Sequence, residues 1–161
     1  ILVGAVHLPG RHSMRGHIPS ETSAFAQARS NAARDWLDMA AFEAILSPSA
    51  VQGRTLTQCL QSGSVLGVWI GELKLFLFPP WQLDSTGMPL PVLSEVLSLL
   101  RGPYGVSAGG PTSGWEEIEW LIAPHARLCG GSPAEALALH PALVLEAAKQ
   151  DFSSWSDDAR W

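Results

Sequence analysis

Apolar residues recur with helical spacing in the first half of the chain. Residues 34–46, "RDWLDMAAFEAIL", predict a helix because their apolar positions repeat every three or four residues. The positions that share one face of this helix are Trp36, Leu37, Ala40, Ala41, Ala44 and Ile45. Pro48 disfavours helical backbone at Ser47, so the helix is expected to end there. A second, shorter helix is predicted over residues 50–61, closing at Gly63. Its inward positions are Val51, Leu56, Cys59 and Leu60.

The hydrophobic period changes in "SVLGVWIGELKLFLFPPWQLD", which begins at residue 64. Branched and aromatic residues crowd this stretch, and Gly71 with Glu72 falls near its middle. Two strands joined by a tight turn, a β-hairpin, are therefore predicted. Pro79 and Pro80 end the second strand, because neither can donate a hydrogen bond to a strand ladder.

A helix and then a linker follow the hairpin. Pro91 opens the helix "VLSEVLSLL", and Gly102 with Pro103 stops it. One side of this helix is formed by Leu93, Val96, Leu97 and Leu100. Residues 102–114, "GPYGVSAGGPTSG", are rich in glycine, serine and proline and have no periodicity. This composition predicts a linker that divides two domains.

The next helix is predicted in "SGWEEIEWLIA". Ser113 and Glu116 have the spacing of a capping box, in which each side chain bonds the backbone N–H of the other residue. The expected buried stripe consists of Trp115, Ile118, Leu121 and Ile122. Glu116, Glu117 and Glu119 are expected on the water-facing side of the helix.

Two glycines precede a serine and a proline in "RLCGGSPAEAL". This pattern is compatible with a phosphate-binding loop or with the start of a helix. With Ser132 as N-cap, Pro133 takes the first helical position, and Glu135 can bond back to the N–H of Ser132. Gly130 and Gly131 supply the backbone freedom for the turn. The spacings G-x-x-x-x-G-K-[ST] and G-x-G-x-x-G are absent, so a helix start is predicted rather than a phosphate site.

Composition narrows the class of protein. The chain has 161 residues, of which 47% are hydrophobic and 16% charged, as is typical of a folded globule. Its net charge of −5 gives no general attraction to nucleic acid or to anionic membranes. No apolar run approaches the roughly 20 residues that cross a bilayer, so no membrane association is expected.

The cysteines and histidines do not suggest catalytic or metal chemistry. Cys59 and Cys129 lie far apart without a C-x-x-C partner, which favours free buried thiols in a reducing cytoplasm; a structural disulfide is the alternative. His7, His12 and His17 recur every five residues, a spacing that does not match a helical metal-binding pair. We therefore expect a cytoplasmic protein that is not an enzyme and has no catalytic residue, cofactor or metal.

A helix, a turn, a second helix and a β-hairpin, in this order, are typical of a winged helix-turn-helix. In this interpretation the helix over residues 50–61 enters the major groove of DNA, and Lys74 near the wing tip meets a phosphate. The groove-facing residues would be Gln52, Arg54, Thr55, Gln58 and Gln61. Only Arg54 and Lys74 are basic between residues 50 and 80, so a scaffold that does not bind DNA is the alternative.

Residues 119–137, "EWLIAPHARLCGGSPAEAL", resemble the toxin-binding domain of Xre/MbcA/ParS-type antitoxins. That domain has a Trp-Leu pair, a proline, then leucine, two glycines, serine or threonine, proline and a helix ending in leucine. The matching residues are Trp120, Leu121, Pro124, Leu128, Gly130, Gly131, Ser132, Pro133 and Leu137. Cys129 is inserted between the leucine and the first glycine.

The stretch upstream is similar to the wing of a DNA-binding half that is fused to this domain in some members. The similarity lies in a strand, a short turn and a Phe-Pro-x-Trp-Gln stretch, here Phe78, Pro79, Trp81 and Gln82. The serine-arginine opening that is usual in the family's recognition helix is replaced by "SAVQGR", and the wing carries fewer positive charges.

The resemblance implies an antitoxin. Such a protein binds and neutralises a cognate toxin, often a RES-domain enzyme that consumes NAD, represses its own operon through operator DNA, and self-associates into a homo-oligomer. The implied toxin-binding residues are Trp120, Pro124, Leu128, Gly130, Gly131, Ser132 and Pro133. The tail adds Trp155, Arg160 and Trp161 as candidate anchors, since large rings beside polar residues suit a partner's cleft; a tail that packs on its own domain is the alternative. A DNA-binding transcriptional regulator without a toxin partner is the alternative function.

The predicted organisation follows from these segments. The fold is mainly α-helical with a small β-hairpin, and a winged helix-turn-helix-like half precedes a small helical domain. The segments are an N-terminal arm of loop or partial disorder, with helical patterning starting near residue 23, then the winged domain, the linker, the helical toxin-binding domain and the tail. Their bounds are 1–30, 31–101, 102–114, 115–150 and 151–161.

Overall fold

The computed structural model describes residues 21–108 and 112–153. Its contacts divide the chain into two compact units, Ile1–Arg34 and Asp35–Trp161, which are described separately. In the first unit, helix α1 spans Glu21–Ala32. The last part of the predicted N-terminal arm is therefore helical, close to where the helical patterning begins. The rest of the arm, with His7, His12 and His17, lies outside the described residues.

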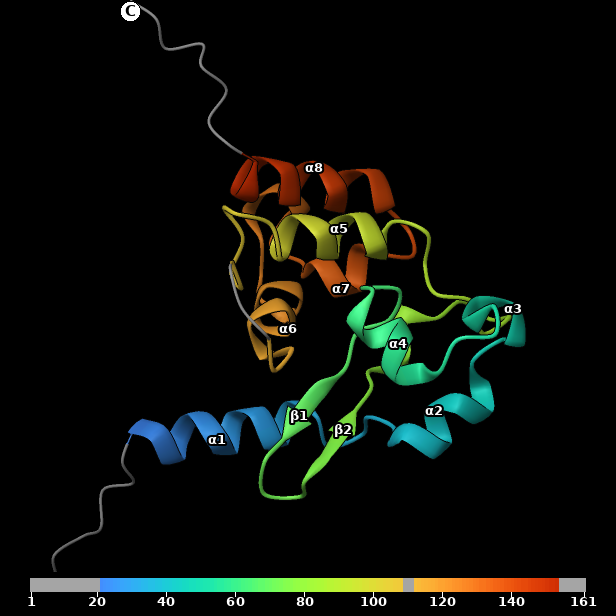
Figure 1. Ribbon diagram of the computed structural model, residues 1–161. Coiled ribbons are helices and arrows are strands. Elements are labelled where there is room, and N and C mark those ends of the chain that lie inside the picture. Colours follow the sequence, from blue (N-terminus) through green and yellow to red (C-terminus); the bar gives the residue numbers. More distant parts are fainter. Residues whose placement is uncertain (1–20, 109–111, 154–161) are drawn as a thin grey trace, which may run out of the picture. The chain divides into compact units, whose positions relative to one another are not determined.

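The second unit is mainly helical and holds a two-stranded antiparallel hairpin, as the sequence predicts (Figure 1). Its helices are α2 (Met39–Ile45), α3 (Pro48–Val51), α4 (Leu56–Gln61), α5 (Leu93–Leu100), α6 (Trp115–Ile122), α7 (Pro133–Ala136) and α8 (Pro141–Phe152). The strands are β1 (Val68–Ile70) and β2 (Leu75–Leu77). The unit also contains two short 3-10 helices, η1 (Pro80–Gln82) and η2 (Ala126–Leu128). None of the described helices combines the length and the apolar character needed to cross a membrane.

Helix α2 buries a different face from the predicted one. It begins after Asp38, whose carboxylate accepts the N–H of Ala41 at 2.8 Å and so caps the helix. Phe42 is fully buried and its ring stacks on Phe78 with centroids 4.8 Å apart, whereas Ile45 is 48% exposed. The prediction for this face is wrong because the short helix turns its one large ring toward the hairpin, a contact that its own sequence does not specify.

The helix predicted over residues 50–61 is broken into α3 and α4. Gln52 and Gly53 both have left-handed backbone, with φ of 50° and 76°. Thr55 then caps α4, and its hydroxyl and the Gln58 side chain form a reciprocal capping box. Glycine adopts the left-handed region at no steric cost, and a threonine with glutamine three residues later starts a new helix. The single twelve-residue helix is therefore a wrong prediction.

The β-hairpin is confirmed, and a buried glutamine ties it to the chain that follows. Val68 pairs with Leu77 and Ile70 with Leu75 in the antiparallel register. Gln82 has no exposed surface, and its amide accepts the N–H of Leu66 and donates to the carbonyl of Leu66, both at 2.7 Å. The side chain thus satisfies two backbone groups of a buried segment that has no strand partner there.

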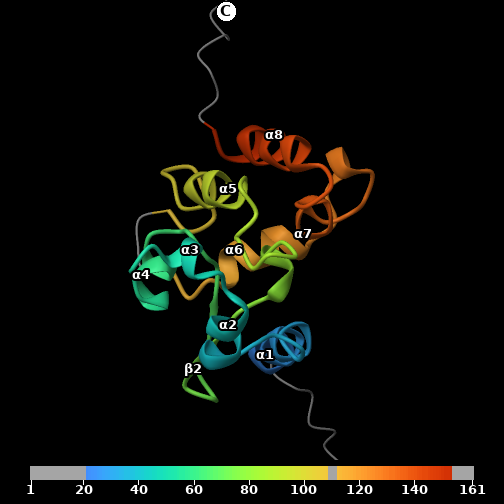
Figure 2. The same cartoon turned by 90° about the vertical axis from the view of Figure 1, so that its right-hand side faces the viewer.

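Helix α5 lies in the core of the second unit. All four residues of its predicted apolar side are fully buried. Helix α5 packs against α8, and both views show the pair as neighbours (Figures 1 and 2). Helix α5 precedes residues 102–114 and α8 follows them, and both helices lie in the unit Asp35–Trp161. The domain boundary at residues 102–114 stays a prediction.

Helix α6 starts and faces differently from its prediction. Gly114, with φ of 86°, is the N-cap, and no side chain caps the helix, so the predicted Ser113–Glu116 capping box is absent. Trp115 and two further residues of the predicted stripe are buried, but Ile122 is 38% exposed. Glu117, predicted on the water-facing side, has no exposed surface. The helix is rotated because it packs between β1, where the indole N–H of Trp115 donates to the Trp69 carbonyl at 3.1 Å, and α7.

Candidate functional site

The chain between α6 and α7 forms a compact loop that supports itself. The carbonyl of His125 accepts the N–H groups of Leu128 at 3.0 Å and Gly130 at 3.2 Å. In return the His125 N–H donates to the Gly131 carbonyl at 3.0 Å, which closes the loop. Cys129 and Gly130 take left-handed backbone, with φ of 55° and 83°. The residues of this turn therefore present a fixed backbone shape; we call residues 123–131 the docking loop.

The loop ends in the predicted helix start. The carboxylate of Glu135 accepts the Ser132 N–H at 2.9 Å, and the Ser132 hydroxyl accepts the Glu135 N–H at 3.2 Å. These contacts hold the pKa of Glu135 below its usual value, through the backbone N–H of Ser132 first and its side chain second. The capping box is confirmed. A carboxylate already occupies the place where a phosphate would meet these amides, which disfavours anion binding at this turn.

A side-chain cluster ties the docking loop to the last turn of α8. One oxygen of Asp151, Oδ2, accepts the indole N–H of Trp120 at 2.9 Å and lies 3.1 Å from Nε2 of His125. The rings of His125 and Phe152 each meet Trp120 edge-on, with centroid distances of 5.8 and 5.4 Å. The four residues come from α6, the loop and α8, so the cluster joins the consecutive α6 and loop to a helix end 26 or more residues later.

The hydrogen bonds of His125 define its chemistry. Nδ1 accepts the backbone N–H of Arg127 at 3.2 Å, so the ring proton must sit on Nε2, facing Asp151. An Asp–His pair orients a general base when the second nitrogen is free to take a proton from a nucleophile. Here the second nitrogen is already bonded to the protein. The arrangement therefore suits a structural fastening of the loop.

The toxin-binding residues that the family resemblance implies fall into two groups. Those of the motif lie together on α6, the docking loop and the start of α7: Trp120, Pro124, Leu128, Gly130, Gly131, Ser132 and Pro133. Pro124 and Gly130 are exposed, whereas Ser132 and Pro133 are buried and support the turn. The tail residues Trp155, Arg160 and Trp161 lie outside the described residues. Sequence reasoning missed His125 and Asp151, because their contact spans 26 residues.

The predicted DNA-reading residues do not form one outward face. Arg54 folds back, with Nε donating to the Val51 carbonyl at 3.2 Å and Nη1 to the Ser62 hydroxyl at 3.0 Å. Thr55 and Gln58 are engaged in the capping box of α4. Gln52 lies in the left-handed turn before α4, apart from Gln61 at the helix end. The common helix face on which the prediction rested is absent, because the helix is broken at Gly53.

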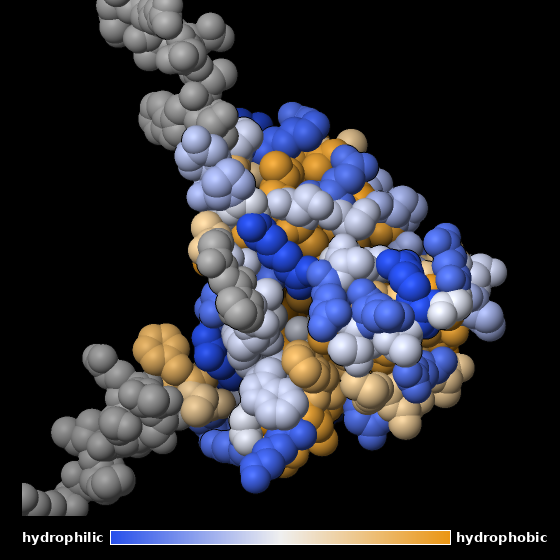
Figure 3. All heavy atoms as spheres, viewed as in Figure 1, coloured by the Kyte–Doolittle hydropathy of each residue, from blue (hydrophilic) through white to orange (hydrophobic). Residues whose placement is uncertain are grey.

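The wing carries more apolar than basic surface. Lys74 is exposed at the turn between the strands, in left-handed backbone with φ of 51°. Its neighbours Leu73 and Trp69 are 61% and 40% exposed. The space-filling view shows orange apolar atoms at the surface beside blue polar ones in this region (Figure 3). A single exposed lysine offers little neutralisation of DNA phosphates.

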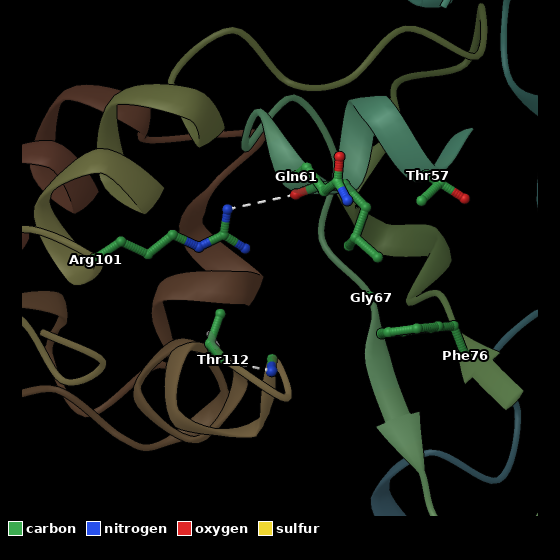
Figure 4. A pocket seen from close by; sticks show the side chains of 8 residues that line it. Thr57, Gln61, Gly67, Phe76, Arg101 and Thr112 are labelled. Atoms are coloured by element: carbon green, nitrogen blue, oxygen red, sulfur yellow. Dashed lines mark hydrogen bonds between the residues drawn. The ribbon is translucent and has the colours of Figure 1, made fainter. Parts of the chain in front are cut away.

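A cavity of about 400 Å³ opens between α4, the hairpin and the ends of α5 and α6. Its lining residues are Thr57, Leu60, Gln61, Gly67, Phe76, Arg101, Thr112 and Gly114 (Figure 4). The Arg101 guanidinium reaches in from α5, where one terminal nitrogen lies 3.5 Å from the Leu60 carbonyl. The lining is mostly apolar, with hydroxyl and amide groups contributed by Thr57 and Gln61.

Arg101, which lines this cavity, forms an ion pair with the buried Glu117 that sequence reasoning missed. Nε of Arg101 donates to Oε1 of Glu117 at 2.8 Å, and the Thr112 hydroxyl donates to Oε2 at 2.7 Å. No local pattern points to this pair, because Glu117 has the spacing of a water-facing residue and Arg101 precedes the predicted linker. Its contribution is to hold the end of α5 against the start of α6.

The cysteines are free; Cys59 is buried, as predicted, but Cys129 is exposed on the docking loop. Within residues 21–108 and 112–153, no three histidine, cysteine or acidic side chains gather to hold a metal ion. Comparisons with protein-family models, with curated proteins and with solved structures each give no match to this chain.

Proposed function

We propose that the protein is an antitoxin-like inhibitor that holds a partner toxin with the docking loop and its flanking helices. The observation that supports the proposal is this arrangement: residues that resemble a toxin-binding motif lie together on α6, the docking loop and the start of α7, and the loop is closed by the bonds of His125 and bonded to α8 through Asp151. A preformed loop binds a partner without the entropic cost of ordering it.

The exposed part of the docking loop suits a protein partner. Its exposed residues are Ala123, Pro124, Ala126, Arg127, Cys129 and Gly130. Small and apolar groups let a partner's backbone approach closely, and Arg127 supplies one cation for an acidic or hydrogen-bonding cleft. In keeping with the family resemblance, we propose a RES-domain enzyme that consumes NAD as the toxin. The protein would act by covering that enzyme's active site.

The test is co-expression with the product of the adjacent gene, followed by co-purification and an NAD-consumption assay. We expect one complex in which NAD consumption is suppressed. Gly130→Arg should disrupt it, because a large side chain would stand on the exposed turn. Ser98→Arg, an exposed change on α5, is the matched control. Absence of a complex, or free NAD consumption within it, would refute the proposal.

We propose that residues 35–101 are a reduced winged helix-turn-helix that serves mainly as a scaffold. The order of α2, α3, α4 and the hairpin supports the winged arrangement. The inward bonds of Arg54 and the short α4 favour the scaffold over a reader of DNA. A gel-shift assay with the gene's own promoter at low salt tests this. A sequence-specific shift that Arg54→Ala abolishes would favour operator binding and repression, and light scattering would detect the expected homo-oligomer.

A further inference from the structure

We infer that Asp151 is a positioning residue that sets the shape of the docking loop from the end of α8. The part of this inference that concerns partner binding rests on the proposed function. Its physical basis is the pair of bonds to one carboxylate oxygen, from the Trp120 indole at 2.9 Å and from Nε2 of His125 at 3.1 Å. Bonds to a charged acceptor are about twice as strong as those between neutral groups.

The two bonds act on different parts of the same surface. The bond to Trp120 fixes the indole on α6, which Phe152 also meets edge-on. The bond to His125 fixes the ring whose Nδ1 accepts the Arg127 N–H and whose own backbone closes the loop. Asp151 therefore controls, through His125, the orientation of the turn that carries Arg127. A change at this one carboxylate therefore reaches both Trp120, an implied toxin-binding residue, and the loop, through His125.

The described chain also brings the end of α8 to the motif. Phe152, the last residue of α8, contacts Trp120 edge-on, and Asp151 precedes it in the same helix. Both residues belong to the segment 151–161 that was predicted as the tail, so the first two residues of that segment are helical and contact the motif.

The experiment compares full-length variants Asp151→Ala and Asp151→Asn with Gln150→Ala, a neighbouring exposed change. Asparagine keeps an oxygen acceptor without the charge, so it should rescue much of the effect. Val144→Ala is a second control, because Val144 is fully buried in α8 and its truncation lowers stability without touching the cluster. Three quantities are measured: the NMR shifts of the Trp120 indole N–H and the His125 ring nitrogens, amide exchange in the docking loop, and affinity for the adjacent-gene toxin.

We expect Asp151→Ala to shift the Trp120 and His125 resonances and to speed amide exchange at Arg127 and Gly130. Affinity should fall about tenfold, the loss that corresponds to one charge-assisted hydrogen bond. Asp151→Asn should lie between Asp151→Ala and the native chain, and Val144→Ala should keep native affinity. Unchanged loop exchange in Asp151→Ala would overturn the inference, as would native affinity despite faster exchange. If the native chain binds no toxin, the proposed function fails, and loop exchange alone decides whether Asp151 positions the loop.

Discussion

Nε of Arg101 lies 2.8 Å from Oε1 of Glu117, so an ion pair whose carboxylate is fully buried joins the end of α5 to the start of α6. Arg101→Met should lower the free energy of unfolding by about 3 kcal/mol, because removing one partner leaves a buried charge uncompensated. Chemical denaturation with urea measures this loss.

The pair also predicts the behaviour of a double variant. Arg101→Met combined with Glu117→Leu should recover most of the lost stability, since apolar replacement of a whole buried pair is often neutral. Lys149→Met, which breaks the exposed pair of Lys149 with Glu146, should cost less than about 1 kcal/mol. A double variant as unstable as Arg101→Met alone would contradict this account.

Two glycines with the same backbone conformation should respond differently to alanine. Gly114 and Gly130 have φ of 86° and 83°, but a Cβ at Gly114 would lie 2.1 Å from the Gly67 carbonyl oxygen, whereas a Cβ at Gly130 meets nothing within 4 Å. Gly130→Ala should cost about 1 kcal/mol, the strain of a left-handed alanine. Gly114→Ala should cost clearly more, because α6 must move away from β1. Thermal denaturation compares the stability of the two variants. Equal losses of stability would mean that α6 can move away from β1 at little cost.

The buried amide of Gln82 predicts a large effect of an apolar replacement. Gln82→Leu should lower the unfolding free energy by about 2–4 kcal/mol, because the buried N–H and carbonyl of Leu66 lose their partners together. Gln150→Leu, an exposed change on α8, should stay within about 0.5 kcal/mol. Urea titration of both variants decides the matter. A loss of stability below this range for Gln82→Leu would contradict the account and would mean that water bonds the Leu66 N–H and carbonyl in place of the amide.

The capping box of α7 predicts a dependence on pH. The pKa of Glu135 is lower in the folded chain than in the unfolded one, so its contribution to stability is present above the unfolded pKa and is lost as pH falls through the folded pKa. Ser132→Ala should cost about 1 kcal/mol near neutral pH and return the pKa of Glu135 only part of the way to its usual value, because alanine keeps the backbone N–H that is the larger cause. NMR titration of the Glu135 carboxyl measures the pKa, with Ser98→Ala as a control. If the pKa of Glu135 in Ser132→Ala equals that in the native chain, the Ser132 side chain has no part in lowering it.

Local patterns were sufficient for several elements. The hairpin, the buried side of α5 and the Ser132 helix start all follow from residues that lie within one segment. In each case the interactions involved are between neighbours in sequence: cross-strand pairing over a tight turn, an apolar stripe, and a reciprocal pair of bonds three residues apart. Such contacts are specified by spacing alone.

Contacts between distant segments decided which helix faces are buried and which side chains meet at the candidate site. Phe42 rather than Ile45 is buried because a ring 36 positions later stacks on it, and Glu117 is buried because Arg101 and Thr112 neutralise and bond it across the predicted linker. Asp151 reaches Trp120 and His125 only after α8 has packed on the rest of the unit. The resemblance to a toxin-binding motif rests on spacing within one segment, but the Asp151 carboxylate that bonds Trp120 and His125 has no such local signal. Partners that meet only on folding leave no periodic signal in the chain.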